Sequence, residues 1–156
     1  MLKFSNMKQL YLSILTSLIL FSCSDKELSK NDILGKYGEN GDWYFEFKSN
    51  LDLKSYLKDT ANIPEWMLEL ENMKHDYDGI VYMEKNTGEA GLGLWKYKGI
   101  SDWGGTMVYI TWQKYGYLNL SLYRNGSWYF KKSGSDIYFT ASKLDYNSKI
   151  TTWEKQ

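Results

Sequence analysis

The sequence contains one histidine, His75, which stands beside two carboxylates, Asp76 and Asp78. A histidine oriented by an aspartate could serve as the general base for a serine nucleophile. However, the chain has no Gly-x-Ser-x-Gly motif, in which many hydrolases carry that serine. The spacing of the three residues also matches neither the usual zinc motifs nor the calcium-binding loop. The stretch is therefore typical of a solvated connection, and we predict no metal site there.

A pair of carboxylates could hydrolyse a glycosidic bond if two strands brought them together. The candidates are scattered and no pattern marks any of them as buried: Glu46, Asp52, Glu84, Glu89 and Asp136. The glycines of the segment 91–93 lack the following helix and lysine of a phosphate-binding loop. We therefore expect no enzymatic activity and no cofactor, and an envelope hydrolase is the weakest of the functional alternatives.

The strongest chemical signal is Cys23, the only cysteine of the chain. It follows an apolar run over residues 10–21, which is preceded by Lys3 and Lys8 and by no acidic residue. A basic start followed by a short apolar run is typical of a secretory signal, and the run is too short to span a bilayer. A lone cysteine also excludes disulfide bonds within the chain.

The four residues Leu20-Phe21-Ser22-Cys23 resemble the lipobox of bacterial lipoproteins. The resemblance implies diacylation of the Cys23 thiol, cleavage after Ser22 and acylation of the new amino terminus. Residues 1–22 are then a lipoprotein signal peptide, and the polar residues 23–31 a lipid-anchored tether. We expect a protein of the bacterial cell envelope that is held at a membrane through Cys23, the outer membrane being favoured, on its periplasmic or surface face.

The composition excludes other classes of partner and favours β-structure. The chain has 19 basic and 19 acidic residues, so no basic excess indicates nucleic acid. It contains 7 Trp, 14 Tyr and 6 Phe together with 13 Gly and a single Pro. Aromatic residues favour strands, and the glycines suit turns and bends of a sheet.

Period-two alternation predicts strands along most of the chain after residue 32. The segment 43–48 should pair in a hairpin with 51–54, and Asn125-Gly126 predicts a two-residue turn. Further strands are expected over 80–83, 91–98, 107–113, 118–123, 128–131, 137–140 and 150–154. One helix is expected over 62–73, with Asn62 as its N-cap, Pro64 in its first turn and Glu65 completing a capping box.

About eight strands joined by short turns predict an antiparallel meander that forms a small barrel over residues 32–156, with the helix over one end. A β-sandwich is the alternative. Gly35-Lys36-Tyr37 is similar to the Gly-x-Trp opening of lipocalin-like barrels, with Tyr in place of Trp. That resemblance implies a barrel with a ligand cavity.

Two binding modes follow, both non-enzymatic. In the first, a small apolar ligand lies inside the barrel, and the helix stripe of Trp66, Met67 and Leu70 covers the mouth; core packing is the other interpretation of this stripe. In the second, an exposed aromatic face binds a protein or a glycan. The aromatic candidates for that face are Trp103, Tyr123 and Tyr129, with Tyr44 and Tyr138 also expected to point outward.

Overall fold

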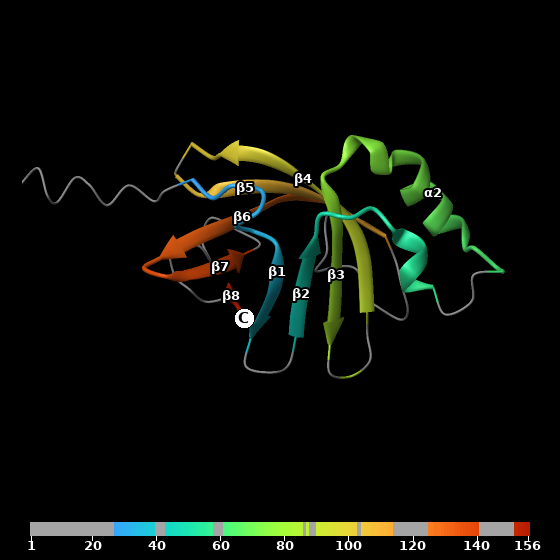
Figure 1. Ribbon diagram of the computed structural model, residues 1–156, viewed down its shortest axis with the longest axis horizontal. Helices are drawn as coiled ribbons and strands as arrows, with labels where there is room; N and C mark the ends of the chain where they lie inside the picture. The colour runs from blue at the N-terminus through green and yellow to red at the C-terminus, as the bar shows by residue number, and fades with distance from the viewer. Residues whose placement is uncertain are drawn as a thin grey trace, which may run out of the picture.

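The computed structural model describes residues 27–39, 43–57, 61–85, 87, 90–102, 104–113, 125–140 and 152–156. Within them, eight antiparallel strands close into a barrel in the order β1 to β8 (Figure 1). The strands are β1 (Gly35–Glu39), β2 (Trp43–Lys48), β3 (Gly79–Lys85), β4 (Ala90–Ile100), β5 (Thr106–Gln113), β6 (Gly126–Ser133), β7 (Asp136–Thr140) and β8 (Thr152–Lys155). The helical elements are the 3₁₀ turn η1 (Leu53–Tyr56), the α-helix α2 (Glu65–Met73) and the 3₁₀ turn η2 (Lys74–Asp76).

The barrel confirms the predicted mainly β fold and rules out the sandwich. Each strand pairs with its neighbours in sequence, and β1 closes the barrel by pairing with β8 at Tyr37 and Lys155. Closure matters because an open meander of this length would leave unpaired edges that invite aggregation. No helix in the described part of the chain is long and apolar enough to cross a membrane.

Aromatic side chains fill the described interior of the barrel. The inward positions of β2 carry Phe45 and Phe47, as their alternation predicts, and both are fully buried. The Phe45 ring lies 4.6 Å from the Trp153 ring and 5.1 Å from the Phe139 ring, measured between centroids. Edge-to-face contacts at such distances are the favoured aromatic geometry. The interior cluster is thus a packed ring network.

The helix α2 lies against the outer wall of the barrel, which corrects the prediction that it covers an end (Figure 1). Met67 and Leu70 are fully buried, and they pack in one cluster with Ile80, Leu92 and Leu94. These strand residues alternate with the inward-facing positions of β3 and β4, so they belong to the outer face. Strand β4 is consequently buried on both faces over Ala90–Trp95.

Two local predictions around this helix are wrong. Strand β2 pairs with β1 and β3, and the segment predicted to complete its hairpin forms the turn η1. Leu53 is buried in the outer-wall cluster, and this tertiary contact outweighs a two-residue alternation. The helix begins after Pro64, whose carbonyl oxygen accepts hydrogen bonds from the N–H groups of Met67 and Leu68. Asn62 therefore lies two residues before the N-cap, and Pro64 takes the N-cap position predicted for Asn62.

Residues 27–34, which we call the N-terminal plug, pack into one end of the barrel. Leu28 is 3% exposed and Ile33 is fully buried, both within the interior cluster. The Leu28 N–H donates a hydrogen bond to Thr106 Oγ1 at 2.9 Å, and the Tyr37 hydroxyl donates to the Ile33 carbonyl at 2.9 Å. The expected tether over 23–31 is thus packed against the barrel from residue 27, where Leu28 is buried and the polar residues 29–31 remain exposed.

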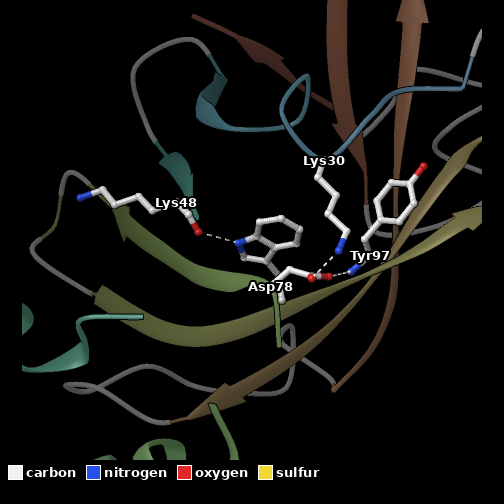
Figure 2. Close-up of polar contacts among 5 residues, drawn as sticks. Lys30, Lys48, Asp78 and Tyr97 are labelled. Atoms are coloured by element: carbon white, nitrogen blue, oxygen red, sulfur yellow. Dashed lines mark hydrogen bonds and ion pairs between the residues drawn. The ribbon is translucent and has the colours of Figure 1, made fainter. Parts of the chain in front are cut away.

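Asp78 fastens the plug to the barrel wall (Figure 2). Its carboxylate accepts from Lys30 Nζ at 2.6 Å and from the Tyr97 backbone N–H at 2.7 Å. Burial opposes ionisation of Asp78, but these hydrogen bonds and the charges of Lys30 and Lys96 hold its pKa below the ordinary value. The ionised carboxylate is therefore the form that the folded chain favours.

We expect Asp78→Ala to lower the free energy of unfolding at pH 7 by about 2 kcal/mol, the scale of hydrogen bonds to a charged group. Most of that arises at the Tyr97 N–H, because the Lys30 side chain is 55% exposed and its ion pair is screened. The pKa of Asp78 is lower in the folded chain than in the unfolded chain, where it is about 4. The ionised carboxylate therefore contributes its full stability above about pH 4, and this contribution is lost as the pH falls through the pKa of the folded chain. Urea unfolding at pH 7 and in acid measures it.

Asp78→Asn keeps a hydrogen-bond acceptor for the Tyr97 N–H but removes the charge. It therefore shows how much of the stability comes from the charge and how much from the hydrogen bond. The stability gap between wild type and Asp78→Asn should narrow as the pH falls below about 4. Asp52→Ala is the matched control, because Asp52 is exposed and the hydrogen bond recorded there uses its backbone carbonyl. A gap that stays constant with pH would contradict the role of the ionised carboxylate.

Candidate functional site

A pocket of about 310 Å³ opens on the outer wall where the cover of α2 and η2 ends. The outer face of β4 continues from Leu92 and Leu94, which the helix covers, to Lys96 and Lys98. We call this pocket the outer-wall pocket. It is lined by Met73, Asp76, Tyr77, Lys96, Lys98 and Tyr109.

The strand register sets the floor of the pocket. Lys96 on β4 is directly paired with Tyr109 on β5, so their side chains leave the sheet side by side. Lys98 Nζ stands 6.0 Å from the centre of the Tyr109 ring, within the range of a cation–π contact. One aromatic face and two ammonium groups therefore share a small area of the wall.

The segment after η2 sets the rim. The Asp78 N–H donates to the Trp95 carbonyl at 2.9 Å, which holds this segment against β4. The Tyr77 hydroxyl lies 2.6 Å from Thr111 Oγ1, and this hydrogen bond fixes the ring beside the pocket. Asp76, the last residue of η2, is exposed and adds a carboxylate to the rim. The rim thus joins a fixed phenol ring to a hydrogen-bond acceptor.

The two lysines give the pocket its charge. Among the described residues, Lys30, Lys48 and Lys74 each form an ion pair with a carboxylate, whereas Lys96 and Lys98 form none. Two ammonium groups two residues apart on one strand face repel each other weakly and favour an anion between them. The pocket can therefore hold a small anionic group against an aromatic ring.

The three residues of the His75 stretch have different surroundings. His75 is exposed on η2, Asp76 lines the outer-wall pocket, and Asp78 is engaged by Lys30 and Tyr97. Over the described ranges, no three His, Cys, Asp or Glu side chains gather in a group that could hold a metal ion.

The residues predicted to bind a ligand fall into three groups. Met67 and Leu70 are fully buried in the outer-wall cluster and Trp66 packs against it, so this stripe holds the helix on the wall. Tyr129 faces outward by register, opposite Met107, and is half-buried. The remaining predicted residues, Cys23, Trp103 and Tyr123, lie outside the described part of the chain.

Tyr44, also expected to point outward, takes part in a second outer cluster on β2 and β3. The hydroxyls of Tyr44 and Tyr82 both donate to Glu84 Oε2, at 2.7 and 3.0 Å, and their rings lie 6.0 Å apart. Burial and the hydrogen bond to Glu84 raise the pKa of Tyr44 above its ordinary value. Here the tyrosines stabilise the curved sheet through cross-strand contacts.

Sequence reasoning missed the outer-wall pocket. The available signal was the pair Lys96 and Lys98, which interrupts an apolar strand with two charges on one face. Only the packing of η2 against β4 and β5 turns that pair into a pocket, and such contacts have no sequence pattern. Comparison of the chain with protein-family models, curated proteins and solved structures finds no match.

Proposed function

We propose that this chain is a non-enzymatic binding protein of the bacterial cell envelope, anchored through lipid at Cys23, whose outer-wall pocket binds an acidic sugar of a glycan. The observation that carries the proposal is the placement of Lys96 and Lys98, neither of which forms one of the described ion pairs, beside the Tyr109 ring. It develops the alternative in which an exposed aromatic face binds a glycan.

An acidic sugar matches each chemical group of the pocket. Its carboxylate would accept charge-assisted hydrogen bonds from Lys96 and Lys98. Its C–H face would lie on the ring of Tyr109 or Tyr77, which offers apolar area with little loss of side-chain entropy. Its hydroxyls would donate to the exposed carboxylate of Asp76. A neutral sugar would lack the first contact, and a simple anion would lack the other two.

The packing of the interior supports a site on the outer wall over one inside the barrel. Fully buried Phe45, Phe47, Phe130 and Phe139 form ring contacts across the barrel, with centroids 5.0 to 5.1 Å apart. A ligand entering this region would have to displace these rings, each of which buries a large area. The outer-wall pocket needs no such rearrangement.

Calorimetric titration of the chain from Ser24 with D-glucuronate tests the pocket. We expect a dissociation constant of the order of 1 mM, which corresponds to a binding free energy of about −4 kcal/mol. Lys96→Ala and Lys98→Ala should each weaken binding about tenfold, since a charge-assisted hydrogen bond contributes about 1.5 kcal/mol or more. Raising the salt concentration should weaken binding further.

Matched controls distinguish binding in the outer-wall pocket from nonspecific attraction of an anion to the lysines of the protein. D-Glucose should bind far more weakly than D-glucuronate, and Lys54→Ala should bind like wild type, because Lys54 is an exposed lysine of η1 away from the pocket. Equal affinity of wild type and both pocket variants for D-glucuronate would refute the proposed site.

A further inference from the structure

We propose that the barrel end closed by the N-terminal plug faces the lipid bilayer, an orientation that rests on the lipid anchor of the proposed function. The partner surface is thus a membrane, and the interface is one particular end of the barrel.

The plug is fixed to the barrel at its first described residues. Besides its bond to Thr106, Leu28 accepts a hydrogen bond through its carbonyl from the Tyr97 hydroxyl at 3.0 Å. The single proton of that hydroxyl is shared with the Glu27 carboxylate, whose Oε1 lies at 2.5 Å. Burial and the contact with Glu27 raise the pKa of Tyr97 to about 12, so it remains a donor at neutral pH. The chain therefore leaves the barrel at a defined point.

Very little chain separates that point from the proposed anchor. Only residues 24–26 stand between Cys23 and Glu27. Fully extended chain spans at most about 3.5 Å per residue, so Glu27 stays within roughly 14 Å of Cys23. Strand β4 alone, from Ala90 to Ile100, is about 33 Å long at the rise of a strand. The anchor thus reaches the plug end and leaves the opposite end remote from the lipid.

The plug end also exposes side chains suited to a bilayer interface. In Figure 1 the blue start of the described chain lies beside the end of β4, away from the end where β3 finishes. Ile100, the last residue of β4, is 50% exposed, and it is one of two large apolar side chains exposed in the described ranges. Lys132 is exposed near the same end, and its charge reaches Asp32 of the plug. An apolar side chain and a lysine exposed at the same end of the barrel fit the boundary between acyl chains and phosphate groups.

Lipid quenching of a fluorescent label tests the orientation in the full acylated chain. The protein is reconstituted into vesicles of phosphatidylethanolamine and phosphatidylglycerol that contain a head-group spin-labelled lipid. One label is attached through Ile100→Cys, a second through Lys132→Cys at the same end, and a third through Thr87→Cys. Thr87 is exposed between β3 and β4 at the opposite end. We expect several-fold stronger quenching at positions 100 and 132 than at 87.

A variant with about twenty Gly and Ser residues inserted after Lys26 serves as the control, since such a linker is flexible and spans roughly 25 Å on average. It should remain bound to the vesicles while the difference between the labels shrinks. Equal quenching at the two ends of the unextended protein, or stronger quenching at 87, would overturn the orientation and leave the anchor intact. Loss of vesicle binding by Cys23→Ser alone supports the anchor. If wild type and Cys23→Ser both fail to bind vesicles, the anchor is refuted and the orientation with it.

Discussion

Gly79→Ala should destabilise the barrel by about 4 kcal/mol or more, the range reached only by severe core substitutions. A Cβ atom at Gly79 would overlap the carbonyl oxygen of Lys48 and would stand 2.7 Å from Trp95 Nε1. That carbonyl accepts the hydrogen bond of the Trp95 indole at 2.9 Å (Figure 2). Neither partner is the end of a flexible chain, so β2 would have to move away from β3 and break the bond.

Gly134→Ala is the control for this prediction. Gly134 lies in the β6–β7 turn with φ of +64°, and a Cβ there meets no atom within 4 Å. Its substitution should cost only the backbone strain of a left-handed conformation, about 1 kcal/mol. Urea unfolding followed by tryptophan fluorescence compares the two variants. Gly79 is not among the glycines with positive φ, so a loss at Gly79 as small as that at Gly134 would show that β2 and β3 adjust to a Cβ atom and would contradict the prediction.

Phe45→Ala should lower the free energy of unfolding by about 3 to 5 kcal/mol, the usual cost of removing a buried phenylalanine. Phe45 is fully buried, and its ring contacts the rings of Trp112, Trp128, Phe139 and Trp153. Truncation leaves a cavity that these large rings cannot close without leaving their rotamers. Thermal or urea unfolding measures the loss.

Two further variants test whether this loss of stability arises from the interior of the barrel. Leu68→Ala should change stability by less than about 0.5 kcal/mol, because Leu68 is 47% exposed on α2. Phe45→Leu should remain folded and should bind D-glucuronate with the affinity of wild type, since the outer-wall pocket lies across the wall of the barrel. Weakened sugar binding in folded Phe45→Leu would place the ligand inside instead.

Alternation in the sequence predicts those strands that have one buried face, whereas β1 (Gly35–Glu39) was not predicted and the predicted strand 118–123 lies outside the described residues. The alternation at Phe45 and Phe47 and that at Trp128 and Phe130 both correspond to inward positions. Alternation of apolar and polar residues is less informative where both faces of a strand are buried, as in β4 over Ala90–Trp95. There the sequence shows a continuous apolar run, and nothing in it says that a helix supplies the second cover.

Long-range contacts account for the remaining differences. Asn125-Gly126 is predicted as a hairpin turn, but Gly126 is the first residue of β6 and pairs with Ile110 of β5. The Asn125 side chain accepts a hydrogen bond from the Trp112 N–H at 2.7 Å. Leu28 looked like part of a polar linker and is a core residue. The outer-wall pocket likewise depends on η2 meeting β4 and β5. In each case the deciding partner is distant in sequence, so a pattern of near neighbours could not reveal it.

Residue-resolved amide NMR of the chain from Ser24, titrated with D-glucuronate, tests the proposed site most directly. We expect saturable shifts at Tyr77, Lys96, Lys98 and Tyr109, and none of similar size with D-glucose. Shifts confined to inward positions such as Phe45, or no saturable shift in the pocket, would contradict the proposed site.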